Sequence, residues 1–158
     1  MSTGNGPTLI PDGRGLHIVV VAAQWHTDIM DALIAGAVRT LDSSGATYSL
    51  VRVPGTFELP VAAQRIATNG AHVDGIVTLG TVIRGGTPHF EYVCQAAALG
   101  LTNVSTSTGV PVGFGVLTCD DVEQAAARAS TDPHGDNKGV EAAHAVLETI
   151  VALRAFTS

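Results

Sequence analysis

The alternation of short apolar runs with amphipathic segments most strongly constrains the fold of this chain. Residues 16–23 (LHIVVVAA) are almost wholly apolar and rich in β-branched side chains, which is typical of a strand covered on both faces. From Thr27 to Gly45, apolar residues recur every three to four positions, which predicts an amphipathic helix that ends at the glycine. A strand followed directly by a helix is the start of a parallel βαβ unit.

The same alternation continues to the end of the chain. Periodicity and turn residues predict further strands over residues 48–53, 75–79 and 111–117, and further helices over residues 59–68, 88–104, 121–129 and about 138–156. Right-handed crossovers then predict a three-layer α/β/α sandwich, flavodoxin-like and doubly wound, around a four-stranded parallel sheet. Residues 1–14 are polar and rich in glycine and proline, so we expect a flexible arm before a single domain over residues 15–158.

Composition excludes several classes of function. Only 14% of the 158 residues are charged, against about 25% in an average soluble domain, which suggests that part of the surface is buried between subunits. The net charge is −6 and the eight basic residues are scattered, so nucleic-acid binding is not expected. No apolar run approaches the roughly 18 residues of a membrane span, and residues 1–14 lack the pattern of a signal peptide, so we expect a cytoplasmic protein. Cys94 and Cys119 form no CxxC pair and are expected to be buried thiols.

Four groups of residues follow the predicted strands, where ligands bind in doubly wound sheets. They are Gln24–His26, residues 54–58, residues 80–89 and the turn after Leu117 that leads to Arg128. Because the carboxyl ends of parallel strands lie at one edge of a sheet, we expect these groups to converge on one site.

Residues 80–89 join a predicted buried strand to a predicted helix through three glycines. The backbone N–H groups near Gly85 and Gly86, the Thr87 hydroxyl as helix cap and the positive end of the helix dipole could hold a phosphate. The spacing is similar to that of a nucleotide-binding P-loop, but Gly86 stands where that loop needs lysine, which disfavours a nucleoside triphosphate. A purely structural turn is the open alternative.

His89 is predicted in the first turn of the same helix, where the helix dipole favours a neutral imidazole suited to act as a general base. An exposed or capping histidine is the alternative. His89-Phe90-Glu91 also matches the start of the zinc deaminase signature, but the P-C-x-x-C part is missing, so a zinc site is rejected.

Other candidate residues are weaker when taken singly. Trp25 could stack on a planar ring or could be a core aromatic, and Glu58 could bind hydroxyl groups or could only favour a helix start. Lys138 opposes the dipole of the last helix, which hints at a ligand, although most lysines are plain surface residues. Arg128 taken alone is predicted to be a surface arginine. Gly113-Phe114-Gly115 lacks the third glycine of a dinucleotide-binding loop.

Five segments together resemble lumazine synthases in order and spacing over nearly the whole chain. They are VVVAAQWHTDIMDAL, VPGTFELPVAA, LGTVIRGGTPHFEYVC, GVLTCDDVEQAAARAS and DNKGVEAA. The resemblance implies condensation, without cofactor or metal, of 5-amino-6-(D-ribitylamino)uracil with 3,4-dihydroxy-2-butanone 4-phosphate. The products would be 6,7-dimethyl-8-ribityllumazine, phosphate and water. An archaeal-type riboflavin synthase and a non-catalytic flavin or lumazine carrier are the alternatives.

The resemblance also implies a role for each matched residue. The residues implied for the ribitylaminouracil are Trp25, Thr56, Phe57, Glu58, Thr81, Val82, Ile83 and, from an adjacent subunit, Phe114. The residues implied for the butanone phosphate are Gly86, Thr87, Arg128 and Lys138, with His89 as the proton donor.

Family members are pentamers or assemblies of pentamers, so the resemblance implies a pentamer with sites shared between adjacent subunits, and a possible association with riboflavin synthase. The stretch between Arg128 and Lys138 is longer than in capsid-forming relatives, which favours a simple pentamer. Trp25-His26 stands where Phe-Asn is frequent, Gly86 replaces a larger residue and Cys119 replaces a threonine.

Overall fold

A computed structural model describes residues 9–69 and 71–156, so most of the predicted arm over residues 1–14 lies outside the described residues. Four parallel strands form one sheet in the order β2-β1-β3-β4. The strands are β1 (His17–Ala23), β2 (Thr47–Val53), β3 (Gly75–Ile83) and β4 (Val112–Cys119). The helices are α1 (Thr27–Ser44), α2 (Leu59–Asn69), α3 (His89–Thr108), α4 (Val122–Ala127) and α5 (Lys138–Leu153), with a 3₁₀ turn, η1, at Thr56–Glu58.

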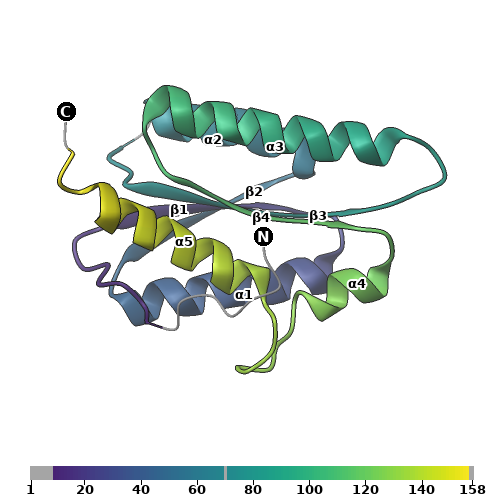
Figure 1. The fold of residues 1–158 in the computed structure, drawn as a ribbon, viewed down its shortest axis with the longest axis horizontal. Coiled ribbons are helices and arrows are strands. Elements are labelled where there is room, and N and C mark those ends of the chain that lie inside the picture. The colour runs from purple at the N-terminus through teal and green to yellow at the C-terminus, as the bar shows by residue number, and fades with distance from the viewer. Residues whose placement is uncertain (1–8, 70, 157–158) are drawn as a thin grey trace.

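The helices cover both faces of the sheet, as Figure 1 shows: α2 and α3 lie on one face, and α1, α4 and α5 on the other. This arrangement confirms the predicted three-layer α/β/α sandwich with a four-stranded parallel sheet. None of the helices in the described ranges is long and apolar enough to span a bilayer.

Strand β1 shows how the sequence pattern produces two cores. Successive side chains of a strand point to opposite faces, so Ile18, Val20 and Ala22 pack with residues of α1 and α5. Val19 and Val21 pack with residues of α2 and α3 on the other face. Six of the seven β1 residues are buried, as expected of a central strand.

Two helix ends follow local sequence signals, and a third does not. Gly45 ends α1 with φ 84°, a left-handed conformation that glycine adopts without steric cost. The Asp121 side chain accepts a hydrogen bond from the Gln124 N–H and caps α4, as predicted. The prediction for Thr87 was wrong, because Pro88 is the N-cap of α3 and no side chain caps that end.

The ends of β3 and β4 are longer than predicted. Strand β3 continues to Ile83, because it pairs with β4 as far as the Ile83–Cys119 register pair. Gly80 therefore lies inside a strand and is not part of the loop before α3. Two helices end earlier than predicted: α4 ends at Ala127 and α5 at Leu153.

Strand β2 is an edge strand with little cover. Six of its seven residues are exposed, including Tyr48, Leu50 and Val51. Apolar side chains on an open sheet edge are unusual in a monomer, because unpaired edges promote association.

Candidate functional site

The four predicted residue groups follow strand ends that lie along one edge of the sheet. Ala23 pairs in register with Val53, Ala22 with Leu79, and Ile83 with Cys119. The loops after β1, β2, β3 and β4 therefore all leave the same edge, on the right in Figure 1. The four groups therefore follow strand ends at one edge, as predicted, which is where doubly wound sheets bind ligands; that they form one site stays a prediction.

Backbone groups of β3 are left without a strand partner at this edge. Strand β1 pairs with β3 only as far as Leu79, whereas β4 pairs with it as far as Ile83. Within the described ranges, the side of residues 80–83 that faces away from β4 is therefore flanked by the loops after β1 and β2. N–H and C=O groups on that side are free to bind the edge of a planar ring.

The loop after β1 presents an aromatic ring to solvent. Trp25 is 70% exposed, so it is not a core aromatic. It lines a shallow hollow together with Gln24, His26, Thr27 and Pro54. His26 has φ 63°, the one positive φ at a non-glycine residue among residues 9–69 and 71–156. Asn and His are among the residues that tolerate this conformation best, so His26 fits this position.

The loop after β2 brings a carboxylate next to this ring. A Cβ atom built on Gly55 would lie 3.4 Å from Trp25 Cδ1 and 3.2 Å from Glu58 Oε2. The absence of a side chain at Gly55 therefore lets the indole and the carboxylate lie close to its backbone. Phe57 is 63% exposed, whereas Thr56 is buried.

The end of β3 carries the residues predicted to touch the pyrimidine edge. Thr81 is buried and its hydroxyl donates to Met30 Sδ at 3.3 Å, so its side chain belongs to the core. Val82 and Ile83 are partly buried. The Thr81 side chain is therefore closed to a ligand, whereas the backbone of this segment is available at the sheet edge.

The loop between β3 and α3 is open to solvent. Gly85, Gly86, Thr87 and His89 are all exposed, and His89 is the first residue of α3. A Cβ atom built on Gly85 or Gly86 would meet no other atom within 4 Å. Gly80 belongs to β3 and not to this loop, which is a second reason against a P-loop beside the missing lysine. The loop still ends at a helix N-terminus that can hold an anion.

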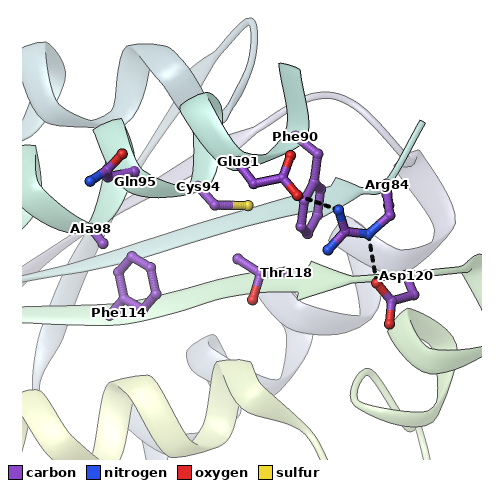
Figure 2. Close-up of a pocket in the computed structure, with 9 residues that line it drawn as sticks. All are labelled: Arg84, Phe90, Glu91, Cys94, Gln95, Ala98, Phe114, Thr118 and Asp120. Carbon is purple, nitrogen blue, oxygen red and sulfur yellow. Dashed lines mark hydrogen bonds and ion pairs between the residues drawn. The ribbon is translucent and has the colours of Figure 1, made fainter. Parts of the chain in front are cut away.

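Sequence reasoning missed Arg84, the first residue of this loop. Figure 2 shows its guanidinium between two acidic side chains: Nε donates to Asp120 Oδ1 at 2.8 Å, and Nη1 donates to Glu91. Its Cζ lies 4.4 Å from the centroid of the Phe90 ring, a cation–π distance. The hydrogen bonds to Arg84 lower the pKa of both Glu91 and Asp120. The only sequence signal was an arginine next to the loop glycines.

Phe114 lies in a groove between α3 and β4. Figure 2 shows its ring beside Ala98 and Gln95 of α3, in a hollow of about 560 Å³ that Arg84 and Asp120 close at the other end. This groove shares no lining residue with the hollow at Trp25. Phe114 and Trp25 of one chain therefore line separate hollows. Cys94 lines the same groove and is partly buried, whereas Cys119 is buried as predicted.

Arg128 and Lys138 are joined through the backbone. Arg128 ends α4, and its carbonyl accepts a hydrogen bond of 2.9 Å from the Lys138 N–H. The Asn137 side chain holds this junction: Nδ2 donates to the Ser130 carbonyl and to the Ala32 carbonyl, and Oδ1 accepts from the first turn of α5.

The position of Lys138 has an explanation without a ligand. Its Nζ lies 2.6 Å from Glu141 Oε2 and 3.2 Å from Asp136 Oδ1, and its side chain is only 17% exposed. Desolvation lowers the pKa of this ammonium group, but the hydrogen bonds to Glu141 and Asp136 outweigh that effect and raise it. Two carboxylates therefore compensate for the unfavourable helix dipole.

Metal ligands do not gather at this edge. Among the described residues, no three His, Cys, Asp or Glu side chains form a cluster that could hold a metal ion. The expectation of a reaction without metal or cofactor stays a prediction.

The fold and the edge define a class: a doubly wound α/β protein that binds a small molecule at the carboxyl ends of its parallel strands. Residues 15–154 match the family model for 6,7-dimethyl-8-ribityllumazine synthase. Proteins with that same name are similar to this chain. The one from Kineococcus radiotolerans is 57% identical over 98% of this chain and 95% of its own length. The one from Leifsonia xyli is 58% identical over 91% and 90%, and the one from Clavibacter sepedonicus is 50% identical over 98% of both chains.

The chain belongs to the 6,7-dimethyl-8-ribityllumazine synthase family. Its function is that of a lumazine synthase, an enzyme of riboflavin biosynthesis. Of the three functions considered from the sequence, the comparisons support the first.

Proposed function

We propose that the chain condenses 5-amino-6-(D-ribitylamino)uracil with 3,4-dihydroxy-2-butanone 4-phosphate at the carboxyl edge of its sheet. The supporting observation is the unpaired side of residues 80–83, which lies between the loop of Trp25 and the glycine loop before α3. A planar ring and a phosphate could bind there side by side.

The pyrimidine subsite consists of the loops after β1 and β2. The Trp25 indole stacks on the ring, and the backbone of Thr81, Val82 and Ile83 binds the ring edge. The ribityl chain runs along Thr56, Phe57 and Glu58, where the carboxylate accepts hydrogen bonds from hydroxyl groups. The closeness of Trp25 and Glu58 to Gly55 supports this assignment.

The phosphate subsite consists of Gly86 and Thr87 at the N-terminus of α3. Backbone N–H groups and the helix dipole favour an anion there. Arg128 supplies the charge partner, and Lys138 adds a second cation from the neighbouring backbone position. Arg128 suits this role because its side chain is exposed, and the only hydrogen bond of that side chain in the described residues goes to the Gln124 carbonyl.

The reaction requires an amine to add to a ketone, phosphate to leave and a ring to close, with release of water. His89 at the start of α3 supplies and removes protons, and neither metal nor cofactor is needed. Holding both substrates side by side can lower the barrier by about 7 kcal/mol or more, whereas one acid–base group gives about 10²- to 10⁴-fold. Orientation therefore contributes more than His89.

The assembly that fits this site is a homo-oligomer with sites shared between subunits, a pentamer by the resemblance. Phe114 lines a different hollow from Trp25 in one chain, so a neighbouring subunit is needed to bring Phe114 onto the ring. The low fraction of charged residues and the exposed strand β2 agree with burial of part of the surface between subunits. Light scattering tests the pentamer, and a shell-sized particle would contradict it. Association with riboflavin synthase and a cytoplasmic location stay predictions.

The proposed reaction is tested by incubating the protein with both substrates and following the fluorescence of the lumazine. Omission of either substrate should abolish the signal. Conversion of lumazine alone to riboflavin would indicate a riboflavin synthase, and tight lumazine binding without turnover would indicate a carrier. Either result would overturn the proposal.

A further inference from the structure

Arg84 connects three elements around the glycine loop. Its backbone N–H donates to the Cys119 carbonyl at 2.9 Å, which continues the pairing of β3 with β4. Its side chain bonds to Asp120 after β4, and to Glu91 and the Phe90 ring in the first turn of α3. The residue that begins the loop therefore also contacts the helix turn at its end.

These contacts set the geometry of an otherwise open segment. Gly85 and Gly86 have no neighbour within 4 Å of a built Cβ atom, so side-chain packing does not hold them in place. The Arg84 guanidinium closes the loop by joining residue 84 to residues 90 and 91. The conformation of residues 85–88, and with it the position of Gly86, Thr87 and His89, depends on this closure.

Electrostatics argue against a direct contact between Arg84 and a phosphate. One guanidinium faces two carboxylates, Glu91 and Asp120, whose pKa values are lowered by their hydrogen bonds to it. The three groups together carry a net charge of −1 at neutral pH, which repels an anion. A guanidinium already bound by two carboxylates also has fewer free N–H groups for a third oxygen ligand.

The geometry points to Arg84 as a positioning residue that shapes the phosphate loop for the butanone phosphate without touching it, a role that rests on the proposed function. The planar fork of arginine binds both carboxylates at once, which lysine cannot do. A shift of the loop weakens phosphate binding. The pyrimidine subsite instead consists of the loops of Trp25 and Glu58 and the backbone of residues 81–83, which the pairing of β3 with β4 holds without the Arg84 side chain.

The test compares Arg84→Gln, Arg84→Lys and Asp120→Ala with the unaltered protein. The measurements are KM for each substrate, the Kd of inorganic phosphate and the unfolding temperature. We expect Arg84→Gln to raise the KM of the butanone phosphate and the Kd of phosphate about tenfold, since misplacement by about 1 Å can cost up to 10²-fold. The KM of the ribitylaminouracil should change less than twofold. Arg84→Lys should recover only part of the loss.

Asp120→Ala should change the Kd of phosphate in opposite directions for the two possible roles of Arg84. If Arg84 positions the loop, loss of Asp120 loosens it and the Kd of phosphate rises. If Arg84 binds phosphate itself, loss of a competing carboxylate frees the guanidinium and the Kd falls, which would overturn the proposal. The Asp120→Ala measurement tests the proposal even if Arg84→Gln fails to fold.

Arg14→Gln is the matched control, because Arg14 also forms an exposed ion pair, with Asp12, but at the opposite end of β1. It should leave both KM values unchanged. Equal increases of both KM values in Arg84→Gln, with a lowered unfolding temperature, would show a general structural role and would overturn the proposal. Absence of lumazine from the unaltered protein would instead overturn the proposed function, and the phosphate measurements would still test Arg84.

Discussion

A Cβ atom built on Gly80 would lie 2.6 Å from Oγ1 of Thr56. Gly80 lies inside β3, and Thr56 begins the 3₁₀ turn that leads to Phe57 and Glu58. The absence of a side chain at Gly80 therefore lets the loop after β2 pack directly on the strand that carries the backbone of the proposed ring subsite.

Gly80→Ala should displace Thr56, because the two side chains cannot share this space. Overpacking of this kind costs about 1–3 kcal/mol, so the free energy of unfolding should fall by about that amount. The KM of the ribitylaminouracil should rise more than that of the butanone phosphate. The double variant Gly80→Ala, Thr56→Ala removes the clash and should recover stability. If it were no more stable than Gly80→Ala alone, the contact would not be the cause.

His89 and Arg128 should contribute unequally to turnover. His89→Ala should lower kcat by about 10²-fold, because it removes an acid–base group while both substrates stay oriented. Arg128→Ala should lower kcat/KM for the butanone phosphate by about 10³-fold, since loss of one partner of a charge-assisted contact costs about 2–5 kcal/mol. Steady-state rates decide this. A completely inactive His89→Ala beside a near-normal Arg128→Ala would contradict both assignments.

Gly86→Ala should stabilise the protein and preserve the site. In the described ranges, positive φ values among glycines occur at Gly15, Gly45 and Gly109 and not at Gly86, and a Cβ atom there meets no neighbour. An alanine therefore fits the native backbone and restricts the unfolded chain, which is worth about 0.4–1 kcal/mol. A less mobile loop should also lower the KM of the butanone phosphate. Gly45→Ala, at φ 84°, is the opposite control and should destabilise. A destabilised Gly86→Ala would show that the loop needs a conformation reserved for glycine.

The Arg84 ion pairs predict a specific acid dependence. Hydrogen bonds to Arg84 lower the pKa of Glu91 from 4.5 and of Asp120 from 3.8. Because the folded-state pKa values are depressed, this stabilisation is present above about pH 4.5 and is lost as the pH falls through the lower folded-state values. The difference in unfolding temperature between the unaltered protein and Arg84→Gln should be largest near pH 6–7 and should shrink below pH 4. These side chains are exposed, so the difference is small. A gap that stays constant down to pH 3 would exclude the two carboxylates as its source.

Much of the fold was predictable because local patterns and tertiary packing agree. Some local patterns predict only one structure. Examples are the buried run of β1, the glycine after α1 and the Asp121 cap. The extension of β3 to Ile83 was not predictable, since it depends on pairing with β4, more than 30 residues away. Because of the same long-range pairing, Gly80 lies in β3 and not in the loop, so its spacing to Gly85 is not that of a P-loop.

Candidate site residues were predictable where a residue type is unusual for its position. Trp25 and the glycine loop stand at strand ends, which sequence order reveals. The role of Lys138 stays a prediction, because its ion pairs with Asp136 and Glu141 explain its helix position without a ligand. Arg84 was missed, because its function depends on Asp120 from another loop.

The Asn137 hydrogen bonds make residues 131–136 a separate segment that can change in length. Because Asn137 bonds to the carbonyls of Ser130 and Ala32 and to the first turn of α5, both ends of this segment are fixed from inside the fold. All six residues are exposed. A peptide epitope or an affinity tag inserted here would be displayed on the outside, while the backbone bond between Arg128 and Lys138 stays intact. The segment is thus a grafting site for engineering this scaffold.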